Sequence, residues 1–136
     1  MQFMERYKDY AMVPVRLALG WISMAHGGQK LFGWWGGVGL VGFANFLEGY
    51  GFRWAFFWAV LLSIIDFVGG FLVLTGIWAR WAALCLSFSG FVRIFFIHWK
   101  YGFSLSNNGY EYSLALLGLS VTLLLSGPGR WTWRGK

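Results

Sequence analysis

A histidine and a lysine, His26 and Lys30, stand four residues apart in the apolar, aromatic stretch MAHGGQKLFGWWGG at residues 24–37. Residues four apart lie one above the other on an α-helix, so both side chains project from the same face. An imidazole can take up or release a proton near neutral pH, and an ammonium group donates hydrogen bonds with a full positive charge. The pair predicts a polar site on one face of an otherwise apolar helix.

Four further ionisable side chains interrupt apolar segments: Asp66, Arg93, His98 and Glu111. A charged group in hydrocarbon is costly, so each needs a partner or a water-lined cavity. We predict an Asp66–Arg93 ion pair, because neither group can reach water easily from its expected depth. Glu111 is predicted to face Lys30 or His98 above that pair. All of these side chains are therefore expected to gather at one pocket.

The composition of the chain indicates that a bilayer surrounds the helices that position these groups. Of its 136 residues, 58% are hydrophobic and 12% are charged, where about a quarter charged is usual. A soluble domain of this size could not bury so many apolar side chains. Because a transmembrane helix needs about 20 mostly apolar residues, we predict an all-α integral membrane protein. It forms one domain over residues 1–136, a four-transmembrane-helix bundle with spans at about 14–32, 54–78, 80–99 and 110–127.

The distribution of basic residues predicts the orientation of these spans. Cytoplasmic flanks carry the excess of Lys and Arg, and Arg16 and Arg80 are expected to be such anchors, as are Arg130, Arg134 and Lys136 in the tail. Both termini are therefore predicted to be cytoplasmic. The N-terminal stretch has no short apolar core before a small-residue cleavage site, so we expect a retained leader. The predicted location is the inner (cytoplasmic) membrane of a bacterium or archaeon.

The connection between the first two spans has helical periodicity of its own. Leu40, Phe43, Leu47 and Tyr50 fall on one stripe of a helix. A short amphipathic helix of this kind is typical of one that lies in the membrane interface. We expect it at the outer surface, close to the predicted pocket.

Several classes of function are excluded by the residue content. The formal charge of +6 comes from basic residues at the ends of apolar segments, not from a basic aromatic patch, which argues against nucleic-acid binding. Cys85 is the sole cysteine, so thiol–disulfide chemistry and covalent c-type haem attachment are not expected. His26 and His98 are candidate axial ligands of a b-type haem, but two histidines without supporting spacing are weak evidence for one. No ligand spacing predicts a metal site.

Each of the polar residues also has a purely structural interpretation. His26 can form a hydrogen bond between helices, and His98 can lie at the interface beside Trp99. The long side chain of Lys30 can reach the outer headgroups. Glu111 begins a helix, where a carboxylate is favoured by the helix dipole. Asp66 and Arg93 are the hardest to explain in this way.

The chain resembles the DoxX family of small four-helix membrane proteins over about residues 14–130. The segments that carry the resemblance are RLALGWISMAHGGQKLFGWWGG, DFVGGFLVLTGIWARWAAL, FFIHWKYGF and NGYEYSLALLGLSVTLLLSGPGR, in this order. The family motifs fall on the following residues: His26, Gly27, Lys30, Asp66, Gly69, Gly70, Gly76, Arg80, His98, Glu111, Tyr112 and Gly129. Two positions depart from the family pattern, since the family usually has Glu at Asp66 and an apolar or small residue at Arg93.

The resemblance implies a fold more strongly than a reaction. Relatives belong to a thiosulfate:quinone oxidoreductase, which passes electrons from thiosulfate to membrane quinone, and others are associated with redox-stress complexes. A quinone headgroup needs hydrogen-bond donors and a protonatable group above an apolar slot. We therefore expect catalytic roles for His26, Glu111 and Asp66, and quinone binding by Lys30, Arg93, His98, Trp99 and Tyr112, with Phe32 and Phe95 as further walls.

Two other functions stay open at this point. The chain can be a non-catalytic accessory subunit of a larger respiratory or photosynthetic complex, in which case the polar cluster is structural. A transporter is a further alternative, although four spans are few for that work without a homo-oligomer. The expected partners are the lipid bilayer, other membrane subunits or a second copy of the chain, and quinone or a small redox substrate, with no covalently bound cofactor.

Overall fold

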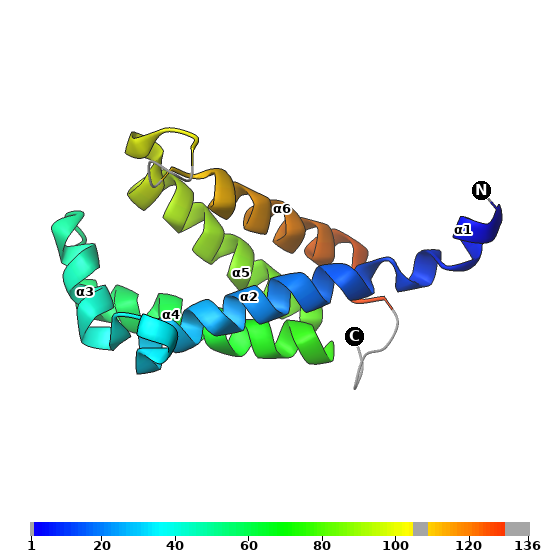
Figure 1. Ribbon diagram of the computed structural model, residues 1–136, viewed down its shortest axis with the longest axis horizontal. Helices are drawn as coiled ribbons and strands as arrows, with labels where there is room; N and C mark the ends of the chain where they lie inside the picture. Colours follow the sequence, from blue (N-terminus) through cyan, green and yellow to red (C-terminus); the bar gives the residue numbers. More distant parts are fainter. Residues whose placement is uncertain (1, 105–108, 130–136) are drawn as a thin grey trace.

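Four long helices form the body of the protein in a computed structural model that describes residues 2–104 and 109–129. They are α2 (Met12–Phe32), α4 (Ala55–Thr75), α5 (Ala79–Val92) and α6 (Glu111–Ser126) (Figure 1). The described residues contain no strand. The all-helical prediction is therefore confirmed, whereas the basic residues predicted in the tail at 130–136 lie outside the described residues.

Shorter helical elements connect and extend this body. They are α1 (Gln2–Arg6), η1 (Lys8–Tyr10), η2 (Trp34–Gly36), α3 (Gly39–Gly49), the π-helix η3 (Arg93–His98) and η4 (Trp99–Tyr101). In Figure 1, α1 extends away from one end of the bundle, and α3 lies at the opposite end. The η3 and η4 turns continue α5 as one long helical segment.

The long helices overlap the predicted segments. The α4 helix ends at Thr75 and not at residue 78, and α5 ends at Val92, although η3 and η4 continue its helical backbone to Tyr101. Two segments have the length and apolarity needed to cross a membrane: Ala55–Thr75, of 21 residues and mean hydropathy 2.3, and Ala79–Tyr101, of 23 residues and mean hydropathy 1.5. The α2 helix is long enough at 21 residues, but its charged and polar residues lower its hydropathy. The α6 helix is apolar but has 16 residues.

Glycines bring α2 and α4 into close contact. A Cβ atom added at Gly70 would lie 2.5 Å from the backbone nitrogen of Met24 and 2.6 Å from the carbonyl oxygen of Gly20. A Cβ added at Gly20 would in turn meet Leu74 and the carbonyl of Gly70. Small residues at such positions allow two backbones to approach each other. This contact fixes the distance between the helices that carry Lys30 and Asp66.

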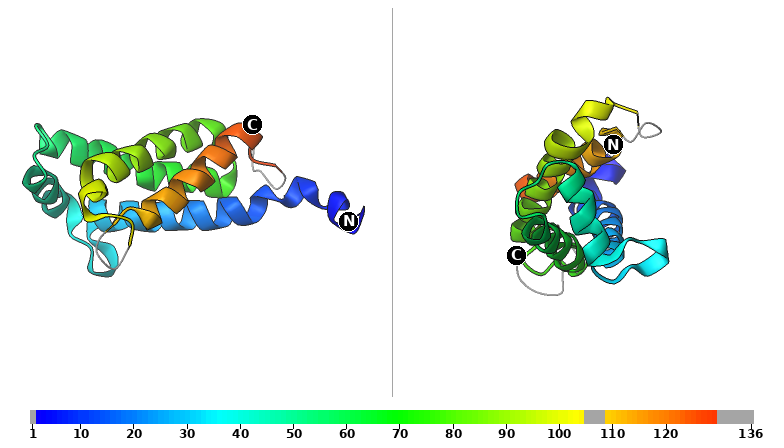
Figure 2. Two further views of the ribbon diagram at one scale, coloured as in Figure 1. Left: turned by 90° about the horizontal axis from the view of Figure 1, so that it is seen from above. Right: turned by 90° about the vertical axis from the view of Figure 1, so that its left-hand side faces the viewer.

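The helix α3 packs its apolar stripe on the bundle. Phe43 and Leu47, with 5% and 0% of their surfaces exposed, join a cluster with Ala59 and Leu62 of α4 and Ile97 of η3. The view along the bundle in Figure 2 shows α3 lying across the end of the helices. The predicted helix is present, and its buried face contacts protein because the apolar residues of α4 and η3 offer it a better-packed partner.

Arg16, which is expected to be a topology anchor, also has a packing role within the bundle. Arg16 is 3% exposed and donates hydrogen bonds to the carbonyl oxygens of Val73 (3.0 Å), Leu74 (3.0 Å) and Pro128 (3.3 Å). The last carbonyls of a helix have no partner within it, so the guanidinium group satisfies the end of α4. Arg16 therefore ties the beginning of α2 to the end of α4 and to the chain after α6.

The substitution Arg16→Met is expected to lower the free energy of unfolding by about 2 kcal/mol, because buried carbonyls lose their donors. The measurement is the midpoint of unfolding in detergent, followed by circular dichroism. Arg6→Met is the matched control, since Arg6 is exposed on α1. Equal losses of stability in the two variants would show that Arg16 has no special role.

Candidate functional site

The ionisable residues lie between two apolar clusters of the bundle. One cluster joins α3 to the first half of α4 and includes Leu62. The other joins α2, α5, α6 and the second half of α4 and includes Leu86 and Val73. Asp66 on α4 and Ser89 on α5 fall between these clusters in the sequence. The polar site is therefore enclosed by apolar packing on both sides along the bundle.

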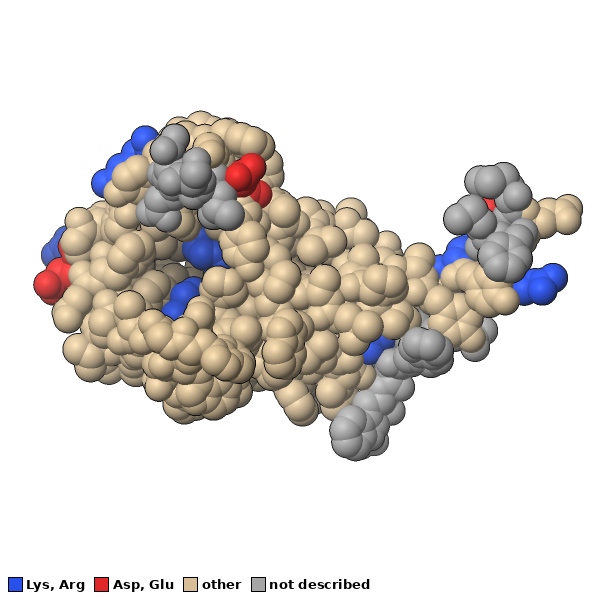
Figure 3. All heavy atoms as spheres, viewed as in Figure 1, with Lys and Arg blue, Asp and Glu red and all other residues tan. Residues whose placement is uncertain are grey.

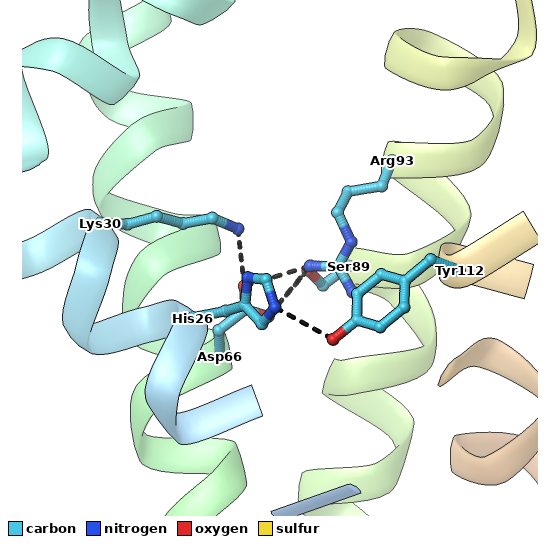
Figure 4. A network of polar contacts seen from close by, with 6 residues as sticks. All are labelled: His26, Lys30, Asp66, Ser89, Arg93 and Tyr112. Carbon is cyan, nitrogen blue, oxygen red and sulfur yellow. Dashed lines mark hydrogen bonds and ion pairs between the residues drawn. The ribbon is translucent and has the colours of Figure 1, made fainter. Parts of the chain in front are cut away.

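Asp66 is the centre of a network that joins three helices (Figure 4). Its Oδ2 lies 2.8 Å from Lys30 Nζ on α2 and 3.1 Å from Arg93 Nη1. Its Oδ1 accepts hydrogen bonds from Arg93 Nη1 at 3.3 Å and from Ser89 Oγ at 3.1 Å. The predicted Asp66–Arg93 pair is confirmed. Lys30 also pairs with Asp66, and the alternative in which it faces Glu111 is wrong.

The network is buried, which decides its energetics. The Asp66 side chain is 2% exposed, and those of Lys30 and Arg93 are 15% exposed. A buried ion pair need not add stability over an apolar core, but removing one partner leaves an uncompensated charge and is strongly destabilising. Asp66 therefore holds two cations at this depth and fixes the positions of both.

Ser89 is a member of the network that the sequence did not suggest. Its hydroxyl donates to Asp66 and accepts a hydrogen bond from Arg93 Nη1 at 3.1 Å. A serine on an apolar helix gives a weak signal by itself. Its position four residues before Arg93, on the same face of α5, is the signal that could have identified it.

A change of helix type brings His98 to the same site as Arg93. Side chains five residues apart point roughly 140° away from each other on an α-helix. In the π-helix η3, which runs over Arg93–His98, the hydrogen bonds connect i to i+5 and each turn holds more residues, so residues five apart point more nearly the same way. Arg93 and His98 consequently line the same cavity. Such π-helical turns occur frequently at functional sites.

His26 and Tyr112 form a second polar pair beside the network. His26 Nε2 lies 3.0 Å from the Tyr112 hydroxyl, and the ring centroids are 5.6 Å apart. The tautomer of the imidazole determines which of the two groups donates. The pair joins α2 to the first turn of α6, so the site takes side chains from all four long helices or their continuations.

A cavity of about 440 Å³ lies between these groups. Figure 3 shows a hollow on one face of the protein with Lys or Arg atoms inside it. The polar part of its lining includes His26, Lys30, Asp66, Arg93, His98 and Tyr112. Phe43 and Phe46 of α3, with Ile97 and Leu116, supply an apolar part. The lining of the cavity is thus partly ionic and partly made of rings and alkyl groups.

Several predicted site residues lie elsewhere. Trp99, Phe32 and Phe95 are 55%, 58% and 47% exposed, and none of them lines the cavity. Phe95 stacks on Trp99, and Trp99 stacks on Tyr110, with centroids 5.3 and 5.2 Å apart, so the rings form a row outside the bundle. Their expected role as walls is wrong, and rings of α3 take that role.

Glu111 lies next to a residue of the cavity lining but is not part of the lining. It is the first residue of α6, directly before Tyr112. Its predicted contact with His98 stays a prediction. Among the described residues, no group of three His, Cys, Asp or Glu side chains is close enough to hold a metal ion.

The helices and the site define an all-helical protein with a buried ionic cluster that opens into a half-apolar cavity. The DoxX family profile matches residues 11–99, which include α2, α3 and α4, Lys30, Asp66 and Arg93. The chain belongs to the DoxX family of membrane proteins. No curated protein and no solved structure matches it.

Proposed function

We propose that this DoxX protein is the quinone-binding component of a membrane oxidoreductase, with the quinone headgroup in the cavity between the four helices. The observation that supports the proposal is the convergence of His26, Lys30, Arg93 and Tyr112 on a cavity that Phe43 and Phe46 also line. A cavity of this size and mixed lining is typical of small-molecule sites.

We infer that all four long helices cross the inner membrane of a bacterium or archaeon, with both termini in the cytoplasm. The length and hydropathy of Ala55–Thr75 and Ala79–Tyr101 support two of these spans directly. The 16 residues of α6 extend over roughly 24 Å, which is close to the thickness of the hydrocarbon core. In this orientation the cavity lies in the outer half of the bundle and α3 lies near the outer interface.

The lining residues fit a quinone headgroup in chemical terms. Lys30 and Arg93 place positively charged donors where a carbonyl oxygen would be held. Phe43 and Phe46 provide a surface for a planar ring and exclude water from the ionic part of the lining. Asp66 does not need to touch the ligand, because its role is to fix the two cations.

Reduction of a quinone consumes protons as well as electrons. The His26–Tyr112 pair, at 3.0 Å, can hold a proton at the Tyr112 hydroxyl and regain it through the imidazole. Glu111, next to Tyr112 in the chain, is the residue that we assign to proton exchange with the outer surface. The electrons must come from a partner protein or from a small reduced substrate.

The substitution Tyr112→Phe is expected to weaken quinone binding about tenfold, because it removes a hydroxyl that lines the cavity while the ring remains. The measurement is the dissociation constant of a short-chain quinone for the purified protein in lipid nanodiscs. Tyr110→Phe is the matched control, since Tyr110 stacks on Trp99 outside the cavity.

Two results would contradict the proposal. One is a wild-type protein that binds no quinone, and the other is equal affinity in the two tyrosine variants. If the protein instead comigrates with large cofactor-bearing subunits after mild detergent extraction and binds no quinone alone, the accessory-subunit alternative is favoured.

A further inference from the structure

The positive and negative charges on the residues that line the cavity are unequal in number. Lys30 and Arg93 carry two positive charges, and Asp66 carries one negative charge, so the described residues of the lining have a formal charge of +1 with the histidines neutral. Both cations are mostly buried, with side chains 15% exposed. An uncompensated charge in a medium of low dielectric constant is expensive. A negative charge within the cavity would remove this cost.

Lys30 and Arg93 also have N–H groups that form no hydrogen bond with the described residues. Every hydrogen bond that Arg93 forms with the described residues leaves from Nη1, so Nε and Nη2 form none with them. Within the described part of the chain, Lys30 Nζ makes one hydrogen bond, to Asp66, and it lies 4.7 Å from the centre of the Phe43 ring. Several N–H groups with positive charge thus remain for an acceptor within reach of the cavity.

We propose that the cavity selects a ligand with one negative charge on an oxygen over a neutral ligand of the same shape. This inference rests on the proposed function, because it specifies the kind of quinone that the site prefers: an acidic quinone whose ring hydroxyl is ionised. The anion takes the place of the missing second carboxylate. Arg93 is the residue that determines this preference, since without it Lys30 and Asp66 form a neutral pair.

Charge selection can be separated from shape with two matched probes. A hydroxynaphthoquinone is ionised at neutral pH, and its methyl ether, a methoxynaphthoquinone, is neutral and of nearly the same size. For wild-type protein in nanodiscs of neutral lipid we expect the dissociation constant of the anion to be lower by a factor of about ten or more, given the strength of a charge pair near 4 Å in a partly buried site.

Variants at Arg93 test the assignment. Arg93→Met is expected to reduce the preference for the anion to about onefold, and Arg93→Lys is expected to retain it because the charge remains. Arg93→Met leaves the Lys30–Asp66 pair and the Ser89 hydrogen bond in place, so the fold should survive. If the Arg93→Met variant does not fold, the Arg93→Lys variant still tests whether the positive charge selects the anion.

Each outcome decides the matter. Equal affinity for the two naphthoquinones, or a preference that persists in Arg93→Met, overturns the inference and leaves the proposed quinone function intact. If neither naphthoquinone binds, the quinone function fails, and benzoate becomes the probe. Binding of benzoate that Arg93→Met weakens tenfold or more then supports an anion site, and absence of such binding overturns it.

Discussion

Replacing Asp66 by asparagine is expected to lower the free energy of unfolding by about 3–5 kcal/mol, the usual cost of removing one partner from a buried ion pair. Asparagine keeps the size of the side chain but removes its charge. Lys30 and Arg93, 2.8 and 3.1 Å from the present carboxylate, would then face each other in a site with a formal charge of +2. The measurement is the unfolding of the purified protein at increasing concentrations of a denaturing detergent, followed by tryptophan fluorescence.

A double variant provides the control for charge. Asp66→Asn combined with Arg93→Met removes one of the two repelling cations, so it should recover a substantial part of the lost stability. A purely steric effect of the asparagine would not be rescued in this way. The account of the network is contradicted if Asp66→Asn alone changes stability by less than about 1 kcal/mol, or if the double variant is the less stable of the two.

Gly70→Ala is expected to be the second most damaging of these substitutions, with a loss of about 3 kcal/mol. The added Cβ would lie 2.5 Å from the backbone nitrogen of Met24 and 2.6 Å from the carbonyl oxygen of Gly20. Backbone atoms cannot rotate away as a side chain can, so α2 and α4 must separate. Because these helices carry Lys30 and Asp66, quinone binding should weaken together with stability.

Gly118→Ala is the matched control for this prediction. Gly118 is an exposed glycine within α6, and a Cβ added there would meet no atom within 4 Å. Alanine is a better helix former than glycine by up to about 1 kcal/mol, so this variant should be at least as stable as the wild type. Similar losses in the two variants would show that contact between α2 and α4 does not depend on glycine.

The sequence predicts the helices well because apolar segments of this length have few other ways to fold. Hydropathy and the breaks at charged or glycine-containing turns were sufficient to place α4 and α5. The interhelical pair of Asp66 with Arg93 also followed from the sequence, since two opposite charges at similar depth have a strong reason to meet. The ion pair between Lys30 and Asp66 did not follow from the sequence, because the sequence does not give the rotation of α2 about its axis.

Two features of the site depend on local geometry that the sequence pattern does not show. The π-helical turn at Arg93–His98 brings both side chains to the cavity where the sequence analysis expects them, although residues five apart on a regular α-helix point away from each other. The helix α3 was predicted from its stripe of apolar residues, but that stripe alone does not distinguish lipid from protein as the partner. The glycines around α3 allow the turn that places Phe43 over Lys30.

Arg16 illustrates a more general difficulty. A basic residue near the end of an apolar segment is normally a topology anchor, and the sequence gives no sign of an alternative. The unpaired carbonyl groups at the end of α4 become visible as its partners only when the helices are placed together. A basic residue at the end of an apolar segment can therefore set the orientation of the helix in the membrane or bind the end of a neighbouring helix.

The most direct test of the central claim, that side chains from different helices form one quinone-binding cavity, is to map a photoreactive quinone on the protein by mass spectrometry. We predict labelling of α3 near Phe43 and Phe46 and of α6 near Leu116, residues that line the cavity, with loss of label when unmodified quinone is added in excess. Label confined to the exposed rings of Phe95 and Trp99, or label that excess quinone does not displace, would contradict the account.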